Sequence, residues 1–155
     1  MVNVIGSKQP RWPGPLAKTT VHGYPLRWAP GLVDAINAVH AEGLADVQWA
    51  STWSAEGWHD DLTAGTGLGP FKAAVAPGTY AVSVAKRVAA QALVATGRRL
   101  VWTDDEVVPA RAADRISLLG PGSGESWLTI RPAPSRGLNP ADLAQVRAFL
   151  TRKVN

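Results

Sequence analysis

Trp49-Ala50-Ser51-Thr52-Trp53 and Trp102-Thr103-Asp104-Asp105-Glu106 are two runs that begin apolar and end abruptly on small or acidic polar side chains. In an open parallel α/β sheet, ligands bind outside the carboxyl ends of the strands. A hydroxyl at one strand end and a carboxylate pair at another suit a phosphate group and a divalent cation. We therefore expect both runs to be strands that end at one binding site.

The segments around these runs alternate between strand and helix patterns. We expect a hairpin over residues 20–28 and strands over 47–50, 100–103, 116–119 and 127–130. We expect helices over 30–42, 55–62, 82–96 and 110–115, and a last helix capped by Asn139. Ser54 is the expected N-cap of the helix over 55–62, without a capping box because Gly57 stands three residues later. This alternation predicts an α/β fold, a Rossmann-like three-layer sandwich with a mostly parallel sheet, in one domain over residues 1–155.

Composition narrows the class of protein. The chain has 155 residues, 46% of them hydrophobic, and no apolar run approaches the ~20 residues of a membrane helix. It has no cysteine, and its first residues lack the basic and apolar regions of a secretory leader, so we expect a cytoplasmic protein without membrane contact. The formal net charge of +4 favours anionic partners such as phosphoesters or nucleic acid.

Four features in chain order carry a family resemblance: the segment 46–53, Lys86, the segment 100–106, and Gly137-Leu138-Asn139-Pro140-Ala141-Asp142-Leu143. Together they resemble the haloacid dehalogenase-like superfamily, in particular the small domain of that superfamily found in bacterial and phage RNA-repair proteins. The likeness covers nearly the whole chain.

The resemblance implies a role for each matching residue. Ser51, or Thr52 beside it, would hydrogen-bond the phosphoryl oxygens, and Lys86 would offset the negative charge of the reacting groups. Asp104 and Asp105 would hold Mg²⁺. Phosphoryl transfer depends mostly on positioning and on neutralising oxygen charge, so these residue types suit a phosphohydrolase.

The first motif of the family is where the chain departs from the pattern. The family reads Asp-x-Asp-Gly-Val-Leu-Asn, and Met1-Val2-Asn3 aligns with its last three residues, so both aspartates would precede residue 1. We expect a start codon placed late, which the nucleotides upstream of Met1 would reveal, and little phosphatase activity in the chain as given. The family's first strand is central in its sheet, so its loss favours pairing of two copies in a homodimer.

The resemblance also implies a small flap, over residues 8–28, and no large cap. Lys8, Arg11, Trp12 and Lys18 mix cations with an aromatic ring and would contact the substrate. A proline-rich surface loop is the alternative for this segment. As a whole, the chain has a second interpretation as a non-catalytic binding module that grips nucleic acid or a host protein.

Each site residue also has a purely structural interpretation. Ser51 and Thr52 suit a helix cap, Lys86 suits a solvated helix face, and Asp104-Asp105-Glu106 suits the acidic start of a helix. The segment His59-Asp60-Asp61 does not predict a metal site, because consecutive residues on a helix point apart. Only the joint arrangement at two strand ends favours a site.

Overall fold

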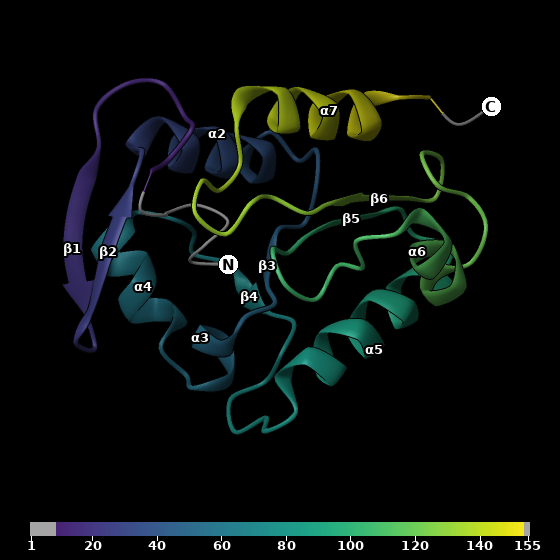
Figure 1. Ribbon diagram of the computed structural model, residues 1–155, viewed down its shortest axis with the longest axis horizontal. Coiled ribbons are helices and arrows are strands. Elements are labelled where there is room, and N and C mark those ends of the chain that lie inside the picture. The colour runs from purple at the N-terminus through teal and green to yellow at the C-terminus, as the bar shows by residue number, and fades with distance from the viewer. Residues whose placement is uncertain (1–8, 154–155) are drawn as a thin grey trace.

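Three short strand pairs form the framework of the structure, a computed structural model that describes residues 9–153 (Figure 1). One pair is antiparallel and two are parallel. The pairs are β1 (Ala17–Val21) with β2 (Tyr24–Trp28), β3 (Gln48–Trp49) with β4 (Lys72–Ala73), and β5 (Leu100–Thr103) with β6 (Trp127–Ile130). The fold is therefore mixed α/β, and the described strands form separate pairs rather than the single sheet that the sequence predicts.

Helices connect and cover these strands. They are α2 (Pro30–Ala41), α3 (Thr52–Ala55), α4 (His59–Thr66), α5 (Val82–Ala95), α6 (Ala112–Leu119) and α7 (Pro140–Thr151). Within residues 9–153, the helices are all too short or too polar to cross a membrane.

The hairpin β1–β2 confirms the prediction for residues 20–28. His22 and Gly23 form its loop with φ angles of 48° and 79°, and such a loop matches the natural twist of the paired strands. One face of the hairpin buries Val21, Leu26 and Trp28 in the core. Helix α4 packs against this hairpin, because Gly65 brings its backbone close to Val21.

The ends of the long helices follow the signals in the sequence. Pro30 is the first residue of α2, and Gly43 follows its end with a φ of 70°. Asn139 caps α7 by accepting hydrogen bonds from the amides of Ala141 and Asp142. The predictions for these two helices are confirmed.

The parallel pair β5–β6 separates two hydrophobic clusters. Val101, Leu128 and Ile130 face the first cluster, which α2 and α7 cover. Leu100, Trp102 and Trp127 face the second cluster, which α5 and α6 cover. This pair therefore has helices on both of its faces. Trp49 lies in the first cluster and Trp102 in the second.

Two predicted elements are wrong. Residues 116–119 belong to α6 and not to a strand, because a short apolar run has no period that distinguishes the two. Residues 55–62 are not one helix: α3 ends at Ala55, Gly57 adopts a φ of 79°, and α4 begins at His59. The left-handed conformation at Gly57 breaks the helical path.

Candidate functional site

A buried ion pair lies at the carboxyl end of β5. Lys86 is on the inner face of α5, and Asp104 is the first residue after β5. The Lys86 Nζ donates to Asp104 Oδ2 at 2.7 Å, and the side chains are 8% and 2% exposed. The structural alternative of a solvated lysine is therefore wrong, since this lysine is held inside the protein by a carboxylate.

The second oxygen of Asp104 is also engaged. Its Oδ1 accepts hydrogen bonds from the amides of Glu106 at 2.9 Å and Val107 at 2.6 Å. Burial raises the pKa of Asp104, but the hydrogen bond from Lys86, the bonds from these two amides and the charge of Lys86 outweigh it. The net effect lowers the pKa below its ordinary value, so Asp104 is an anion at neutral pH.

Two arginines anchor the loop that follows Asp104. Arg131, just after β6, donates to the carbonyl oxygens of Glu106 and Val108. Arg115 of α6 donates to those of Pro109 and Ala110, each at 2.7 Å. Sequence reasoning missed both residues, and the only available signal was the position of Arg131 directly after the strand that pairs with β5.

Ser51 is the N-cap of α3, at the end of β3. The Ser54 amide donates to Ser51 Oγ, and the Ser51 amide donates to Ser54 Oγ, both at 3.2 Å. The capping box therefore exists, with Ser51 at the cap. The structural interpretation of Ser51 as a helix cap is confirmed, and the prediction of Ser54 as the cap of a helix without a capping box is wrong. Ser51 is buried, whereas the neighbouring Thr52 is exposed. Because a hydroxyl both donates and accepts, the Ser51 hydroxyl keeps a proton to donate while its oxygen caps the helix.

The two acidic residues fit a cation that takes only part of its ligands from protein. Asp105 is buried beside Asp104. Asp104 already accepts three hydrogen bonds of the roughly four that a carboxylate offers. Residues 9–153 contain no group of three or more His, Cys, Asp or Glu side chains that could hold a metal ion. Mg²⁺ is usually held by one or two carboxylates together with water and phosphate oxygens, a number that Asp104 and Asp105 would meet.

The predicted substrate-binding residues lie on the hairpin and in the segment before it. Lys18 is exposed on β1, opposite Arg27 of β2. Trp12 packs partly into the first cluster, and its Nε1 lies 2.9 Å from where a Cβ on Gly31 would be. The indole of Trp12 therefore stabilises the core, and Arg11 precedes it on the surface. Lys8 lies outside the described residues.

Comparison with models of known protein families, with curated proteins and with solved structures finds no match to this chain.

Proposed function

We propose that this chain is a haloacid dehalogenase-like protein that binds a phosphoester together with Mg²⁺ at the ends of β3 and β5. The observation that carries the proposal is the buried pair of Lys86 and Asp104. A buried ion pair is a costly feature that a core of apolar side chains would replace without loss of stability. Strongly held charges at a strand end are typical of a site that acts on a charged group.

The strand arrangement supports the same proposal. The parallel pairs β3–β4 and β5–β6 share the first hydrophobic cluster through Trp49, Val101 and Ile130. Among residues 9–153, however, the two pairs are not hydrogen-bonded to each other. The Rossmann-like sandwich that the family resemblance implies would need the two pairs joined in one parallel sheet.

The roles of the residues follow from their surroundings. Lys86, fixed by Asp104, supplies a positive charge that offsets the charge on phosphoryl oxygens. Ser51, with Thr52 as the exposed alternative, donates a hydroxyl proton to one such oxygen. Asp104 and Asp105 would hold Mg²⁺, which supplies Lewis-acid polarisation of the phosphate when bound. We assign the attacking carboxylate to no residue within 9–153.

Phosphate binding tests this proposal directly. Inorganic phosphate with Mg²⁺ should raise the midpoint of thermal unfolding, because a ligand that binds only the folded state stabilises it. Lys86→Met should abolish this rise relative to its own phosphate-free midpoint. Arg87→Met removes an exposed cation from the next position of α5 and should keep the rise. Equal responses of the two variants would refute a phosphate site at Lys86.

Catalysis forms the second arm of the test. A chain extended by an Asp-x-Asp-Gly sequence before residue 1 should hydrolyse phosphoesters in the presence of Mg²⁺, and Asp104→Asn should remove that activity. Failure of the extended chain on both generic phosphoesters and polynucleotide phosphates would overturn the hydrolase role.

A binding module without catalysis is the second candidate function, with nucleic acid or a host protein as its partner. The cations on the outer face of the hairpin favour it, since Lys18 and Arg27 are cross-strand neighbours there. A homodimer is compatible with either candidate, and light scattering with and without Mg²⁺ measures it.

A further inference from the structure

Four of the five large hydrophobic side chains that are exposed among residues 9–153 lie on α5, on α6 or just before α5. We call this group the helix patch, and its members are Tyr80, Val84, Val88 and Ile116. Val84 and Val88 are about one helical turn apart, so they share the side of α5 opposite the buried Lys86. Helix α6, which carries Ile116, packs against α5. A helix with apolar side chains on both its inner and its outer side is typical of one that a partner covers.

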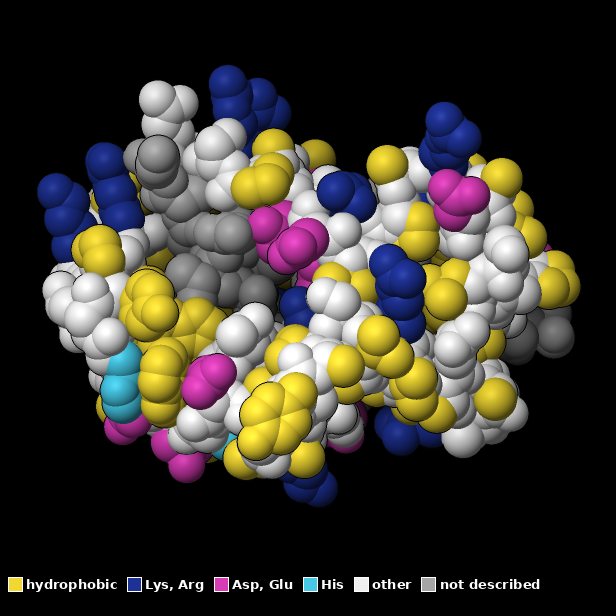
Figure 2. Space-filling view, turned by 60° about the horizontal axis from the view of Figure 1, so that its bottom comes forward, with side chains coloured by type: hydrophobic (Ala, Val, Ile, Leu, Met, Phe, Trp, Pro, Cys, Tyr) yellow, Lys and Arg dark blue, Asp and Glu magenta, His cyan; other side chains and the backbone are white. Residues whose placement is uncertain are grey.

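Free arginines accompany the helix patch. Arg87 lies between the two valines on α5, Arg98 follows the end of α5, and Arg111 precedes α6. All three are exposed, and within residues 9–153 their guanidinium groups have no hydrogen bond or ion pair, unlike those of Arg115 and Arg131. Figure 2 shows hydrophobic side chains interspersed with cations over the half of the molecule that holds α5 and α6. The helix patch therefore suits a partner surface that is apolar and acidic.

The fifth exposed hydrophobic side chain belongs to a second patch, at the end of the hairpin. We call Tyr24, Trp53 and Trp58 the ring patch. The ring centroids of Tyr24 and Trp53 are 5.6 Å apart, and those of Trp53 and Trp58 are 5.8 Å apart. Tyr24 is 54% exposed, and both tryptophans are partly exposed. Because the rings hold one another in place, a partner that covers them orders few free side chains.

Carboxylates lie beside the ring patch. Asp61 Oδ2 is 2.7 Å from Nε2 of His22, whose ring stacks on that of Trp58. Asp60, the preceding residue of α4, is 87% exposed. Residues 28–71, which include α3 and α4, contain six Asp and Glu residues and no Lys or Arg, although the whole chain has a net charge of +4. The ring patch is therefore apolar and acidic.

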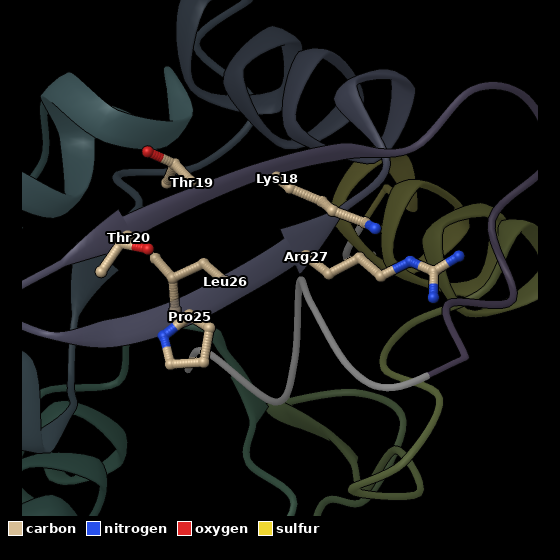
Figure 3. Close-up of a pocket in the computed structure, with 6 residues that line it drawn as sticks. All are labelled: Lys18, Thr19, Thr20, Pro25, Leu26 and Arg27. Atoms are coloured by element: carbon tan, nitrogen blue, oxygen red, sulfur yellow. The ribbon is translucent and has the colours of Figure 1, made fainter.

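The cations of the hairpin lie on its other face. Successive strand residues point to opposite faces, so Tyr24 and Arg27 point apart. Figure 3 shows Lys18 and Arg27 extending in the same direction from neighbouring strands, beside a hollow that both residues line. The ring patch faces α3 and α4 instead, so its carboxylates keep their negative field.

We infer that the helix patch of one copy of this chain binds the ring patch of a second copy. Each patch supplies apolar side chains, and the free arginines of one complement the carboxylates of the other. A contact between two helix patches would instead place arginines against arginines. The inference depends on neither candidate function, since it uses no residue of the phosphate site.

The positions of the two patches favour a closed dimer. Figure 2 shows the hairpin end and the α5–α6 side on one face of the molecule, at opposite ends of its long axis. A two-fold axis between the patches would bring each helix patch onto the ring patch of the other copy. The dimer would then have two identical contacts.

Sedimentation velocity over a range of protein concentrations tests the inference. The wild-type chain should form a dimer that weakens as salt is raised from about 0.05 M to about 0.5 M, because salt screens the attraction between the patches. Val88→Asp puts a carboxylate in the helix patch, and Asp60→Lys puts a cation beside the ring patch. Each should weaken dimerisation by about tenfold or more, because like charges then meet.

An equimolar mixture of Val88→Asp and Asp60→Lys gives the decisive result. In a mixed pair, one contact joins two unaltered patches, and the other joins the new carboxylate to the new cation. The mixture should therefore recover dimers that neither variant forms alone at the same concentration. This recovery requires the two patches to meet each other.

Matched surface residues provide the controls. Ala144→Asp introduces the same carboxylate at an exposed position of α7, and Glu125→Lys reverses an exposed carboxylate before β6. Both should dimerise as the wild type does. Because Val88 and Asp60 are also exposed, far-UV circular dichroism should show all four variants folded.

The remaining outcomes would overturn the inference. These are a wild-type chain that stays monomeric up to about 0.1 mM, a dimer that neither variant weakens, and a dimer that Val88→Asp weakens while Asp60→Lys does not. The last result would show that two helix patches meet. Wild-type species that grow beyond the dimer, with recovery in the mixture, would support the contact and overturn its closure by a two-fold axis.

Discussion

Asp104 is a carboxylate whose stability inside the protein depends on its neighbours. It is 2% exposed, and three donors converge on it, namely the Lys86 ammonium and two backbone amides. Removal of one partner from a buried ion pair leaves an uncompensated charge in a poorly solvated place. Lys86 and Asp104 therefore act as a unit, and a change in either should be judged with the other.

Asp104→Asn removes the negative charge and keeps an oxygen that accepts from the two amides. We expect it to lower the free energy of unfolding by about 3 kcal/mol, because Lys86 stays buried without a counter-ion. Urea unfolding measures this change. Glu106→Gln neutralises an exposed neighbouring carboxylate and should change stability by less than about 0.5 kcal/mol.

The double variant Lys86→Met, Asp104→Asn tests whether the loss comes from the unpaired charge. With both charges removed, stability should recover relative to Asp104→Asn alone, because no buried ion remains. Strictly additive losses would contradict the coupling of the two residues.

The lowered pKa of Asp104 also predicts a pH dependence. In the unfolded chain this carboxyl takes up a proton near its ordinary pKa of about 3.9, while in the folded protein it stays ionised to lower pH. Its contribution to stability is therefore complete above about pH 5 and lost as the pH falls through the folded-state pKa. The difference in unfolding free energy between wild type and Asp104→Asn should shrink between about pH 5 and pH 2. A constant difference over this range would show that charge is not its source.

At the level of elements, the packing of α4 on the hairpin depends on Gly65, which has no side chain. A Cβ on Gly65 would lie 2.8 Å from Val21 Cγ2 and 3.5 Å from Thr19 Cγ2. Valine is stiff at its first torsion and is buried here, so it cannot turn away easily. Close approach of helix and strand therefore requires glycine at this position.

Gly65→Ala should destabilise the protein by about 1–2 kcal/mol, although alanine is the better helix former by about 1 kcal/mol. Thermal unfolding checks the sign. In a Val21→Ala background the clash is absent, so there Gly65→Ala should be neutral or stabilising. Stabilisation in the wild-type background would contradict the close packing of α4 on β1.

Elements with local signals could be predicted from the sequence, and those without could not. Pro30, Asn139 and Pro140 mark helix starts by their own chemistry, and α2 and α7 begin where they stand. The sequence misplaces the start of α3, because Ser51 forms its capping box with a serine, where glutamate or glutamine is usual.

The contacts of Arg115 and Arg131 join residues distant in the sequence, and no local pattern encodes them. The contact of Lys86 with Asp104 was accessible only because strand ends converge in an α/β fold.

At the scale of the whole molecule, β5–β6 connects two hydrophobic clusters through its two faces. Successive residues of β5 point to opposite clusters, with Val101 toward the first and Trp102 toward the second. Loss of this strand pair would expose both clusters to water together. The structure therefore predicts that the two clusters unfold as one cooperative unit.

Leucine-to-alanine changes in each cluster test that cooperativity. Leu32 of α2 is 1% exposed in the first cluster, and Leu119 of α6 is 5% exposed in the second. Each change should cost about 2–4 kcal/mol, because it removes buried apolar contacts and leaves a cavity. For a chain of this size, that lowers the unfolding midpoint by about 10 °C.

The measurement compares two probes within each variant. Far-UV circular dichroism and tryptophan fluorescence should give the same midpoint as each other, since Trp49 lies in the first cluster and Trp102 in the second. Two separate transitions, with only one of them shifted by each variant, would show that the clusters are independent and that β5–β6 does not couple them.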